Sequence, residues 1–191
     1  YPEAHIIRFD FDTTRNKNTH LKLLKDFEEH KADIMLGTQM IAKGLDFSNV
    51  TFVGVLMADL SLMVPDFRAS ERTFQLLCQV AGRSGRGDKP GVAYIQTFVP
   101  DHYVLNLAAE QNYDEFYKEE IALRKSLTYP PFCDICVIGF SAPLESKVIG
   151  ASRWVTQLIK EYISQHKVNF PLRALGPAPC TFEMINNRYR S

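Results

Sequence analysis

The sequence predicts an α/β fold in which helices cover both faces of a parallel sheet. Two observations lead to this prediction. Short apolar runs typical of buried strands occur at residues 4–9, 33–36, 50–57 and 91–98. Segments with apolar residues at helical spacing lie between them, at residues 21–30 and 67–81. Strands that alternate with helices usually pair in parallel, because each helix returns the chain to the same edge of the sheet.

Local signals support each of these helices. Leu21, Leu24 and Phe27 recur at the spacing that places them on one helix face, with charged residues between them. Asp66 precedes the second pattern and is a residue type that caps helices. The glycines of residues 82–87 are expected to end that helix, whose apolar face comprises Phe67, Phe74, Leu77, Cys78 and Ala81.

The character of the chain changes after Pro100. Helical spacing predicts helices over residues 103–111 and 113–127, and Tyr129 ends the second because a residue before proline disfavours helical backbone. A strand over 132–141, a helix over 144–166 and a strand over 168–175 are expected next. We therefore predict an α/β region at residues 1–111, a connecting helix at 112–128 and a partial α+β domain at 129–191.

Composition limits the classes of protein. Of the 191 residues, 22 are basic and 22 acidic, so any contact with nucleic acid must come from a local patch. The longest apolar runs are too short to span a bilayer. Four scattered cysteines and no recognisable signal peptide indicate a cytoplasmic protein. A first residue other than methionine and a basic, aromatic last segment favour a fragment of a longer chain.

The most informative segment is the Gln-x-x-Gly-Arg-x-Gly-Arg pattern of residues 79–86. On a helix, Gln79, Arg83 and Arg86 would share one face, since they are four and three residues apart. Two guanidinium groups beside glycine-rich backbone suit phosphate, because each offers a planar fork to two oxygens. The alternative is a solvated helix end whose arginines face the negative end of the helix dipole.

A second polar segment follows the strand at 33–36. Residues 38–46 read Thr-Gln-Met-Ile-Ala-Lys-Gly-Leu-Asp. Taken one by one, these residues are ordinary caps in a connection from a strand to a helix. As a whole, they place hydroxyl, amide, ammonium and carboxylate groups at the carboxyl end of a strand, where open α/β sheets bind ligands.

These two segments resemble motifs VI and V of superfamily 2 helicases. Further strings narrow the resemblance to the PriA family of bacterial replication-restart DNA helicases; they are the Asp-Phe-Asp-Thr-Thr at 10–14, the Pro-Asp-Phe-Arg-Ala at 65–69, the Tyr-Pro-Pro-Phe at 129–132 and the Gly-Pro-Ala-Pro at 176–179. The resemblance covers essentially the whole chain. It implies a RecA-like second helicase lobe, similar to P-loop NTPases, followed by a truncated α+β C-terminal domain.

The resemblance also implies roles for individual residues. Arg83 and Arg86 would reach ATP that the other lobe holds, with Gln79 ordering them, and an arginine finger of this kind changes the rate by roughly 10³–10⁵. The nucleotide-binding residues would be Gly44, Asp46 and Gly82. The residues that hold the DNA backbone would be Thr38, Gln39 and Lys43.

Other parts of such an enzyme are missing from the chain. None of its ten glycines precedes lysine, so it has no Walker A loop, and it has no Asp-Glu-x-His segment. The resemblance implies that ATP and Mg²⁺ are shared with a first lobe upstream, and that zinc sites also lie upstream and not in these residues. We therefore expect an ATP-dependent helicase as the full-length protein and an inactive fragment.

The resemblance implies that the full-length protein moves 3′ to 5′, recognises stalled forks and initiates primosome assembly. Its partners would be forked and single-stranded DNA, single-stranded DNA-binding protein and other primosome proteins. Arg188, in a basic and aromatic segment, is the candidate contact for an acidic peptide tail; a solvated strand end is the alternative. A non-catalytic RecA-like binding module is the main alternative function, which the joint presence of Arg83, Arg86 and Asp46 disfavours. The amino-acid sequence of residues 39–43 disfavours the other alternative, a different superfamily 2 motor.

Two further features have a structural interpretation. Cys133 and Cys136 form a Cys-x-x-Cys, as in half of a zinc site. On the strand expected there, residues three apart point to opposite faces, so a structural role is favoured over a shared metal. Trp154 and Leu158 are at helical spacing, which favours a core position for Trp154 over a surface that stacks on bases.

Overall fold

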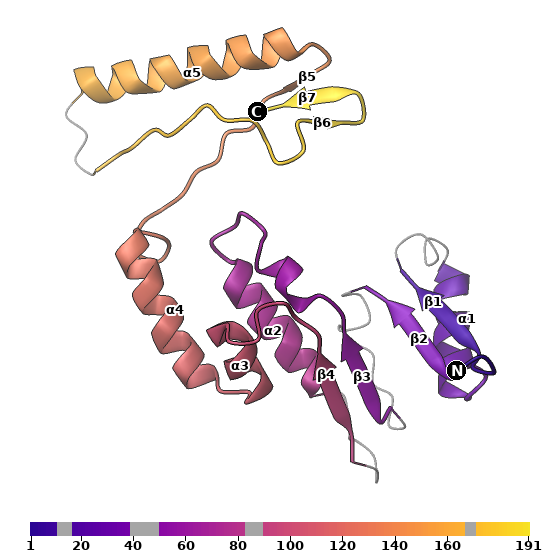
Figure 1. Ribbon diagram of the computed structural model, residues 1–191. Helices are drawn as coiled ribbons and strands as arrows, with labels where there is room; N and C mark the ends of the chain where they lie inside the picture. The colour runs from indigo at the N-terminus through magenta and orange to yellow at the C-terminus, as the bar shows by residue number, and fades with distance from the viewer. Residues whose placement is uncertain (11–16, 39–49, 83–89, 167–170) are drawn as a thin grey trace. The chain divides into compact units, whose positions relative to one another are not determined.

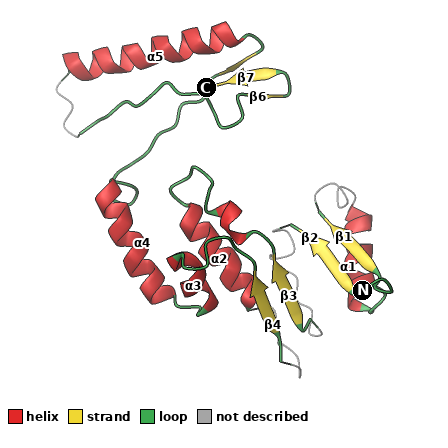
Figure 2. Cartoon of the chain, viewed as in Figure 1, coloured by secondary structure: helices red, strands yellow, loops and turns green. Residues whose placement is uncertain are grey.

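The computed structural model describes residues 1–10, 17–38, 50–82, 90–166 and 171–191. The chain divides into two compact units, Tyr1–Asp134 and Ile135–Ser191. Figure 1 gives the order of the elements along the chain, and Figure 2 separates helices, strands and loops.

Unit 1 begins with a strand, a helix and a parallel strand. β1 (Ile6–Phe9) pairs in parallel with β2 (Ile34–Gly37), with Ile6 opposite Ile34, and α1 (Lys17–Glu28) lies between them in the sequence. Phe9 is buried, and its ring lies 4.8 Å from that of His20 on α1. The predicted strands at 4–9 and 33–36 and the helix ending near residue 30 are therefore confirmed within a few residues.

A second parallel pair follows. β3 (Phe52–Val55) pairs with β4 (Val92–Ile95), with Phe52 opposite Val92. A short 3₁₀ helix, η1 (Ala58–Ser61), and α2 (Ala69–Ala81) connect them. The predicted alternation of parallel strands and helices is thus present. In the described residues, however, the strands pair as two two-stranded sheets, where the sequence predicted one continuous sheet.

Two more helices complete unit 1. α3 (Tyr103–Ala109) begins where the His102 ring nitrogen accepts a hydrogen bond from the Val104 amide, 3.3 Å away. α4 (Tyr113–Leu127) begins at Asn112, whose side chain accepts from the Glu115 amide at 3.2 Å. α4 ends at Thr128, which has a left-handed backbone with φ of 56° just before Tyr129 and Pro130. Both helices were predicted from their apolar spacing.

The core of unit 1 lies where α2, α3 and α4 meet. Its buried residues are Ala58, Phe74, Leu77, Val104, Leu105, Ala108 and Phe116. Phe74 and Phe116 stack with ring centroids 4.1 Å apart, which joins α2 to α4 directly. Val55 and Ile95 pack against this cluster from β3 and β4, so the helices cover one face of that strand pair.

Unit 2 is a helix with a small antiparallel sheet. α5 (Glu145–Gln165) accompanies β5 (Ser141–Ala142), β6 (Met184–Ile185) and β7 (Arg188–Arg190), which pair in the order β5-β7-β6. The helix expected at 144–166 is confirmed. The strand expected at 132–141 is wrong except at its end, since residues 131–140 form no strand. Residues 171–175 also form no strand, and the rest of the strand expected at 168–175 lies outside the described residues.

The missing strand has a physical explanation. A run of β-branched and aromatic residues becomes a strand only where another backbone accepts its hydrogen bonds. Pairing with β7 begins at Phe140, whose amide donates to the Ser191 carbonyl at 2.7 Å. Before that point the apolar side chains are exposed, and Val137 reaches 86%. No described backbone pairs with the segment before Phe140, so its apolar run does not form a strand.

Candidate functional site

α2 carries the described part of the Gln-x-x-Gly-Arg-x-Gly-Arg segment. Gln79 is exposed on its last turn, while Phe74 and Leu77 on the opposite side are buried in the core. Gly82 caps the helix, and its amide donates to the Cys78 carbonyl at 3.0 Å. Arg83 and Arg86 lie outside the described residues. The helix and its glycine end are confirmed, and the shared face of the three side chains stays a prediction.

Thr38 is the described residue of the second segment. It follows β2 directly and is exposed, so its hydroxyl lies at the carboxyl end of a parallel strand, as predicted. Gln39, Lys43, Gly44 and Asp46 lie outside the described residues. The structure therefore places Thr38 and Gln79 at the ends of β2 and α2, and the assembly of the complete site stays a prediction.

A buried carboxylate joins the carboxyl ends of β3 and β4. Asp59 in η1 is almost fully buried, and its Oδ1 accepts a hydrogen bond from the Phe98 amide at 3.1 Å. Burial by itself would raise the pKa of Asp59, but hydrogen bonds from the Thr97 side chain and from backbone amides outweigh it and lower this pKa. Asp59 thus fixes the turn after β4 against η1.

The same 3₁₀ helix is tied to α2 by hydroxyl groups. The Thr73 hydroxyl lies 2.8 Å from the Ser61 hydroxyl and 2.8 Å from the Ala69 carbonyl. The Ser61 hydroxyl in turn donates to the Ala58 carbonyl at 2.8 Å. The N-terminal half of α2 is therefore connected through η1 to the end of β3. Asp66, expected to cap α2, instead stabilises the preceding turn by accepting from the Arg68 amide at 2.9 Å.

A charged group, which we call the Arg124 cluster, joins α2 to α4; it comprises Phe67, Glu71, Glu120 and Arg124. Arg124 donates from Nη2 to Glu71 at 2.9 Å and from Nε to Glu120 at 2.8 Å. Its guanidinium also lies over the Phe67 ring, 5.4 Å from the centroid. Burial would lower the pKa of Arg124, but the two carboxylates outweigh it and raise this pKa, so the residue remains charged.

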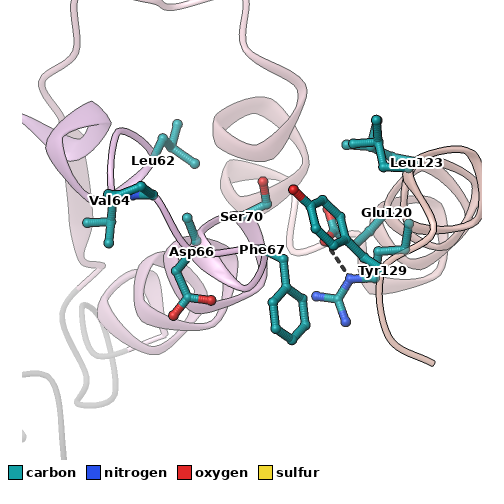
Figure 3. A pocket seen from close by; sticks show the side chains of 12 residues that line it. Leu62, Val64, Asp66, Phe67, Ser70, Glu120, Leu123 and Tyr129 are labelled. Atoms are coloured by element: carbon teal, nitrogen blue, oxygen red, sulfur yellow. Dashed lines mark hydrogen bonds and ion pairs between the residues drawn. The ribbon is translucent and has the colours of Figure 1, made fainter. Parts of the chain in front are cut away.

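α3 joins this group through Tyr103, whose hydroxyl donates to Glu120 at 2.9 Å. Burial and the negative charge of Glu120 raise the pKa of Tyr103 to about 12, although a hydrogen bond with Ser70 opposes the shift. A pocket of about 400 Å³ adjoins the cluster. Figure 3 shows Leu62, Val64 and Asp66 on one side of it, and Glu120, Leu123 and Tyr129 on the other, with Phe67 between them.

Comparison with known proteins identifies the chain. Residues 4–88 match the model of the helicase conserved C-terminal domain. The chain is 46% identical over 189 residues to replication restart protein PriA of Bacillus subtilis (strain 168), covering 99% of this chain and 23% of that protein. It is 40% identical to the PriA of Chlamydia pneumoniae over 100% of this chain and 25% of the relative. It is 38% identical to the PriA of Rickettsia felis over 100% of this chain and 28% of the relative.

The chain is similar over nearly its whole length to proteins of the PriA family. It spans about a quarter of the length of these relatives. The helicase domain match contains both polar segments, residues 38–46 and 79–86. The similarity to PriA proteins continues beyond it through α3, α4 and unit 2, so the Arg124 cluster combines residues inside the domain match, Phe67 and Glu71, with residues after it, Glu120 and Arg124.

Arg188, the candidate partner contact, lies on β7 in the part of the chain that matches PriA beyond the helicase domain. Its guanidinium donates to the Ser141 hydroxyl at 3.1 Å and to the Ser141 carbonyl at 3.0 Å. These bonds join β7 to β5. Contact with a partner stays a prediction.

Trp154 is 65% exposed on α5, so its predicted core position is wrong.

The four cysteines of the chain are all free thiols. Cys133 donates to the Thr128 carbonyl at 2.9 Å, just after the end of α4, and Cys136 is exposed. Neither lies on a strand, so the premise that a strand separates their side chains is wrong. Within the described ranges no three His, Cys, Asp or Glu side chains gather as a metal site requires.

Among the described helices, none is long and apolar enough to cross a membrane.

Proposed function

We propose that this chain supplies the second lobe of an ATP-dependent 3′–5′ DNA helicase that recognises stalled forks and initiates primosome assembly and replication restart. The observation that carries the proposal is the helicase conserved C-terminal domain at residues 4–88, in a chain similar throughout to proteins named replication restart protein PriA. Both polar segments lie inside that domain. The proposed lobe is residues 1–111, with a connecting helix at 112–128 and a partial C-terminal domain at 129–191.

The proposed roles come from the resemblance of the two polar segments to helicase motifs, and the positions of Thr38 and Gln79 support them. Gln79, on the exposed side of α2, would order Arg83 and Arg86 against the charge that develops as the γ-phosphoryl group is transferred. Gly44, Asp46 and Gly82 would contact the nucleotide. Thr38, at the end of β2, would hold the DNA backbone together with Gln39 and Lys43.

Metal ions would be held elsewhere in the full-length protein. The described residues gather no ligand set for a divalent cation. The phosphate loop and Mg²⁺ ligands would come from a first lobe. This division of parts is the reason that the isolated chain is proposed to be inactive. We also propose that the full-length protein is cytoplasmic. Its partners would be single-stranded DNA-binding protein and other primosome proteins, with Arg188 as the partner contact.

The test uses the full-length protein with Arg86→Ala. We expect turnover of ATP in the presence of single-stranded DNA to fall by roughly 10³-fold, with fork unwinding lost and the binding of ATP and DNA retained. Arg72→Ala is the matched control, because Arg72 is an exposed arginine on α2, before Gly82 in the sequence, and it pairs with Asp66 at 2.8 Å. Unchanged turnover in Arg86→Ala would contradict the proposal and favour a non-catalytic binding module.

A further inference from the structure

The two ends of α2 have different tasks. Its C-terminal turn carries Gln79 and leads into the proposed finger arginines, whereas its N-terminal turn carries Glu71, which Arg124 of α4 holds. Eight residues separate Glu71 from Gln79, which is about 12 Å along a helix. A rigid helix transmits any shift or rotation of its first turn to its last. The contact at Glu71 therefore bears on where the finger segment begins.

The apolar contacts of α2 do not by themselves fix its position. Phe74 stacks on Phe116, and Leu77 is buried in the core. Aliphatic contacts are non-directional, and one stacked ring pair holds the helices together but still allows small sliding and rotation of one helix on another. A guanidinium fork that donates to two carboxylates has a defined geometry and tolerates much less.

Arg124 supplies such a fork in a largely buried place. Its side chain is 14% exposed, and its Nε and Nη2 donate to carboxylates on different helices, Glu120 of α4 and Glu71 of α2. The remaining oxygen of Glu120 accepts from Tyr103 at the start of α3. All three helices that form the core of unit 1 are thus registered against one another through Arg124 and Glu120.

The same group also holds the segment that leaves α4. The Tyr129 ring stacks on Phe67 with centroids 5.7 Å apart, and Arg124 Nη1 lies 3.5 Å from the Pro130 carbonyl (Figure 3 shows the two rings). The loop before α2 and the segment after α4 are therefore attached to the same guanidinium. This arrangement stiffens both ends of the α2–α4 pair.

We propose that Arg124 is a positioning residue for the finger segment: by holding Glu71 it fixes the rotation and register of α2, and through α2 the place of Gln79 and of the helix end at Gly82, from which the chain continues to the finger arginines. The inference rests on the proposed function. It adds a residue beyond the helicase domain match, which ends at residue 88. Arg124 touches neither nucleotide nor DNA in this role.

The experiment compares variants of the full-length protein at a temperature well below the unfolding midpoint of each. In Arg124→Met we expect kcat for ATP to fall about 10- to 100-fold, because small misplacement of a catalytic group has an effect of this size. The KM for ATP and the Kd for single-stranded DNA should stay within about twofold, because α2 position matters for the transition state and not for uniform binding. Arg124→Lys should recover part of kcat, since lysine keeps the charge without the fork.

Lys118→Met is the matched control. Lys118 is a cation on the same helix with an ion pair to Glu115 at 2.9 Å, but it is exposed and does not reach α2. It should turn over ATP like the wild type. If Arg124→Met folds poorly, Glu71→Gln removes the same interaction from the more exposed side, and the same fall in kcat is expected. A double variant, Glu71→Gln with Arg124→Met, should lose no more kcat than Arg124→Met alone.

Arg86→Ala is measured in parallel to separate the two ideas. If Arg86→Ala loses turnover while Arg124→Met and Glu71→Gln keep a kcat within twofold of wild type, the positioning role is overturned and the proposed function stands. If Arg86→Ala keeps its turnover, the proposed function is overturned and the positioning role with it. A rise in KM at constant kcat in Arg124→Met would also overturn the positioning role.

Discussion

Replacement of Phe74 by alanine tests how firmly α2 is packed. The ring is only 4% exposed and stacks on Phe116 of α4 at 4.1 Å, within the core that α2, α3 and α4 share. Phe74→Ala removes that contact and leaves a cavity between three helices, which costs about 3–5 kcal/mol in a core. Because the stacked pair contributes beyond its buried area, we expect a loss of about 4 kcal/mol in the free energy of opening this region.

Cys78 provides a local reporter of that opening. It lies one helical turn after Phe74, and its sulfur is 3.8 Å from the Ala108 carbonyl of α3. Burial raises the pKa of the Cys78 thiol, which slows its reaction while α2 is packed. The assay measures the rate at which a thiol reagent labels the peptide that contains Cys78, by mass spectrometry. A loss of about 4 kcal/mol corresponds to a labelling rate about 10³-fold higher when opening and closing are fast relative to the labelling step.

Tyr117→Ala is the control for this measurement. Tyr117 is an aromatic residue on α4 next to Phe116, but it is 53% exposed. Truncation of such a side chain costs about 0.5 kcal/mol, so labelling should rise by less than about threefold. An increase below tenfold in Phe74→Ala, or equal increases in the two variants, would refute the reasoning that this ring holds α2 against α4.

Three further outcomes follow from polar groups. Asp59→Asn should abolish an acid-dependent part of the free energy of unfolding, measured with acid unfolding curves. The pKa of Asp59 in the folded protein is below its ordinary value of 3.8. The carboxylate therefore stabilises the fold above pH 3.8, and this stabilisation is lost as the pH falls through the pKa of the folded state. Tyr103→Phe should remove the phenol whose pKa is raised to about 12, measured by ultraviolet difference spectra. The neutral phenol stabilises the fold below pH 10.0, the ordinary pKa of tyrosine, and this stabilisation is lost as the pH rises from 10.0 toward 12. Arg188→Ala should weaken the pairing of β5 with β7 by about 0.5–1.5 kcal/mol, measured as faster amide exchange at Phe140 and Ser191, whereas Arg173→Ala should leave that exchange unchanged.

Local signals predicted the helices of unit 1 well, because the buried face and the ends are both written in the sequence. α4 has an Asn cap before it and a residue that precedes proline after it, and its predicted bounds agree with the structure. α2 ends at Gly82 as expected. Asp66 was assigned the wrong role, because an aspartate can cap a helix or close the turn before one, and only the tertiary packing of α2 decides between them.

The other strand and burial errors lie in and just before unit 2, where burial depends on partners that spacing does not reveal. The apolar run of residues 132–141 is typical of a strand, yet strand formation needs a neighbouring backbone, and pairing starts only at Phe140. Trp154 shares helical spacing with Leu158, but among the described residues of unit 2 the hydrophobic side chain that is fully buried is Val148. A stripe of apolar residues predicts a helix face and does not predict how much of it is covered.

The candidate site shows the same division between local and distant information. The polar segments at 38–46 and 79–86 are contiguous in sequence, so they could be recognised before the fold was known. The Arg124 cluster could not, since Glu71 and Arg124 are 53 residues apart. The one local signal was the spacing of Glu120 and Arg124, four residues apart on a predicted helix, which indicates an ion pair but not the third partner.

The helicase domain match and the compact structural unit have different C-terminal bounds. The domain match ends at residue 88, yet much of the core around Phe74 and Leu77 of α2 is supplied after it, by Val104, Leu105 and Ala108 of α3 and Phe116 of α4. The compact unit accordingly extends to Asp134. A motif helix whose buried face and whose ion pair both depend on later residues cannot be positioned by the domain alone. The residues that determine how well α2 presents its functional end are therefore to be sought in α3 and α4 as well as in the motifs themselves.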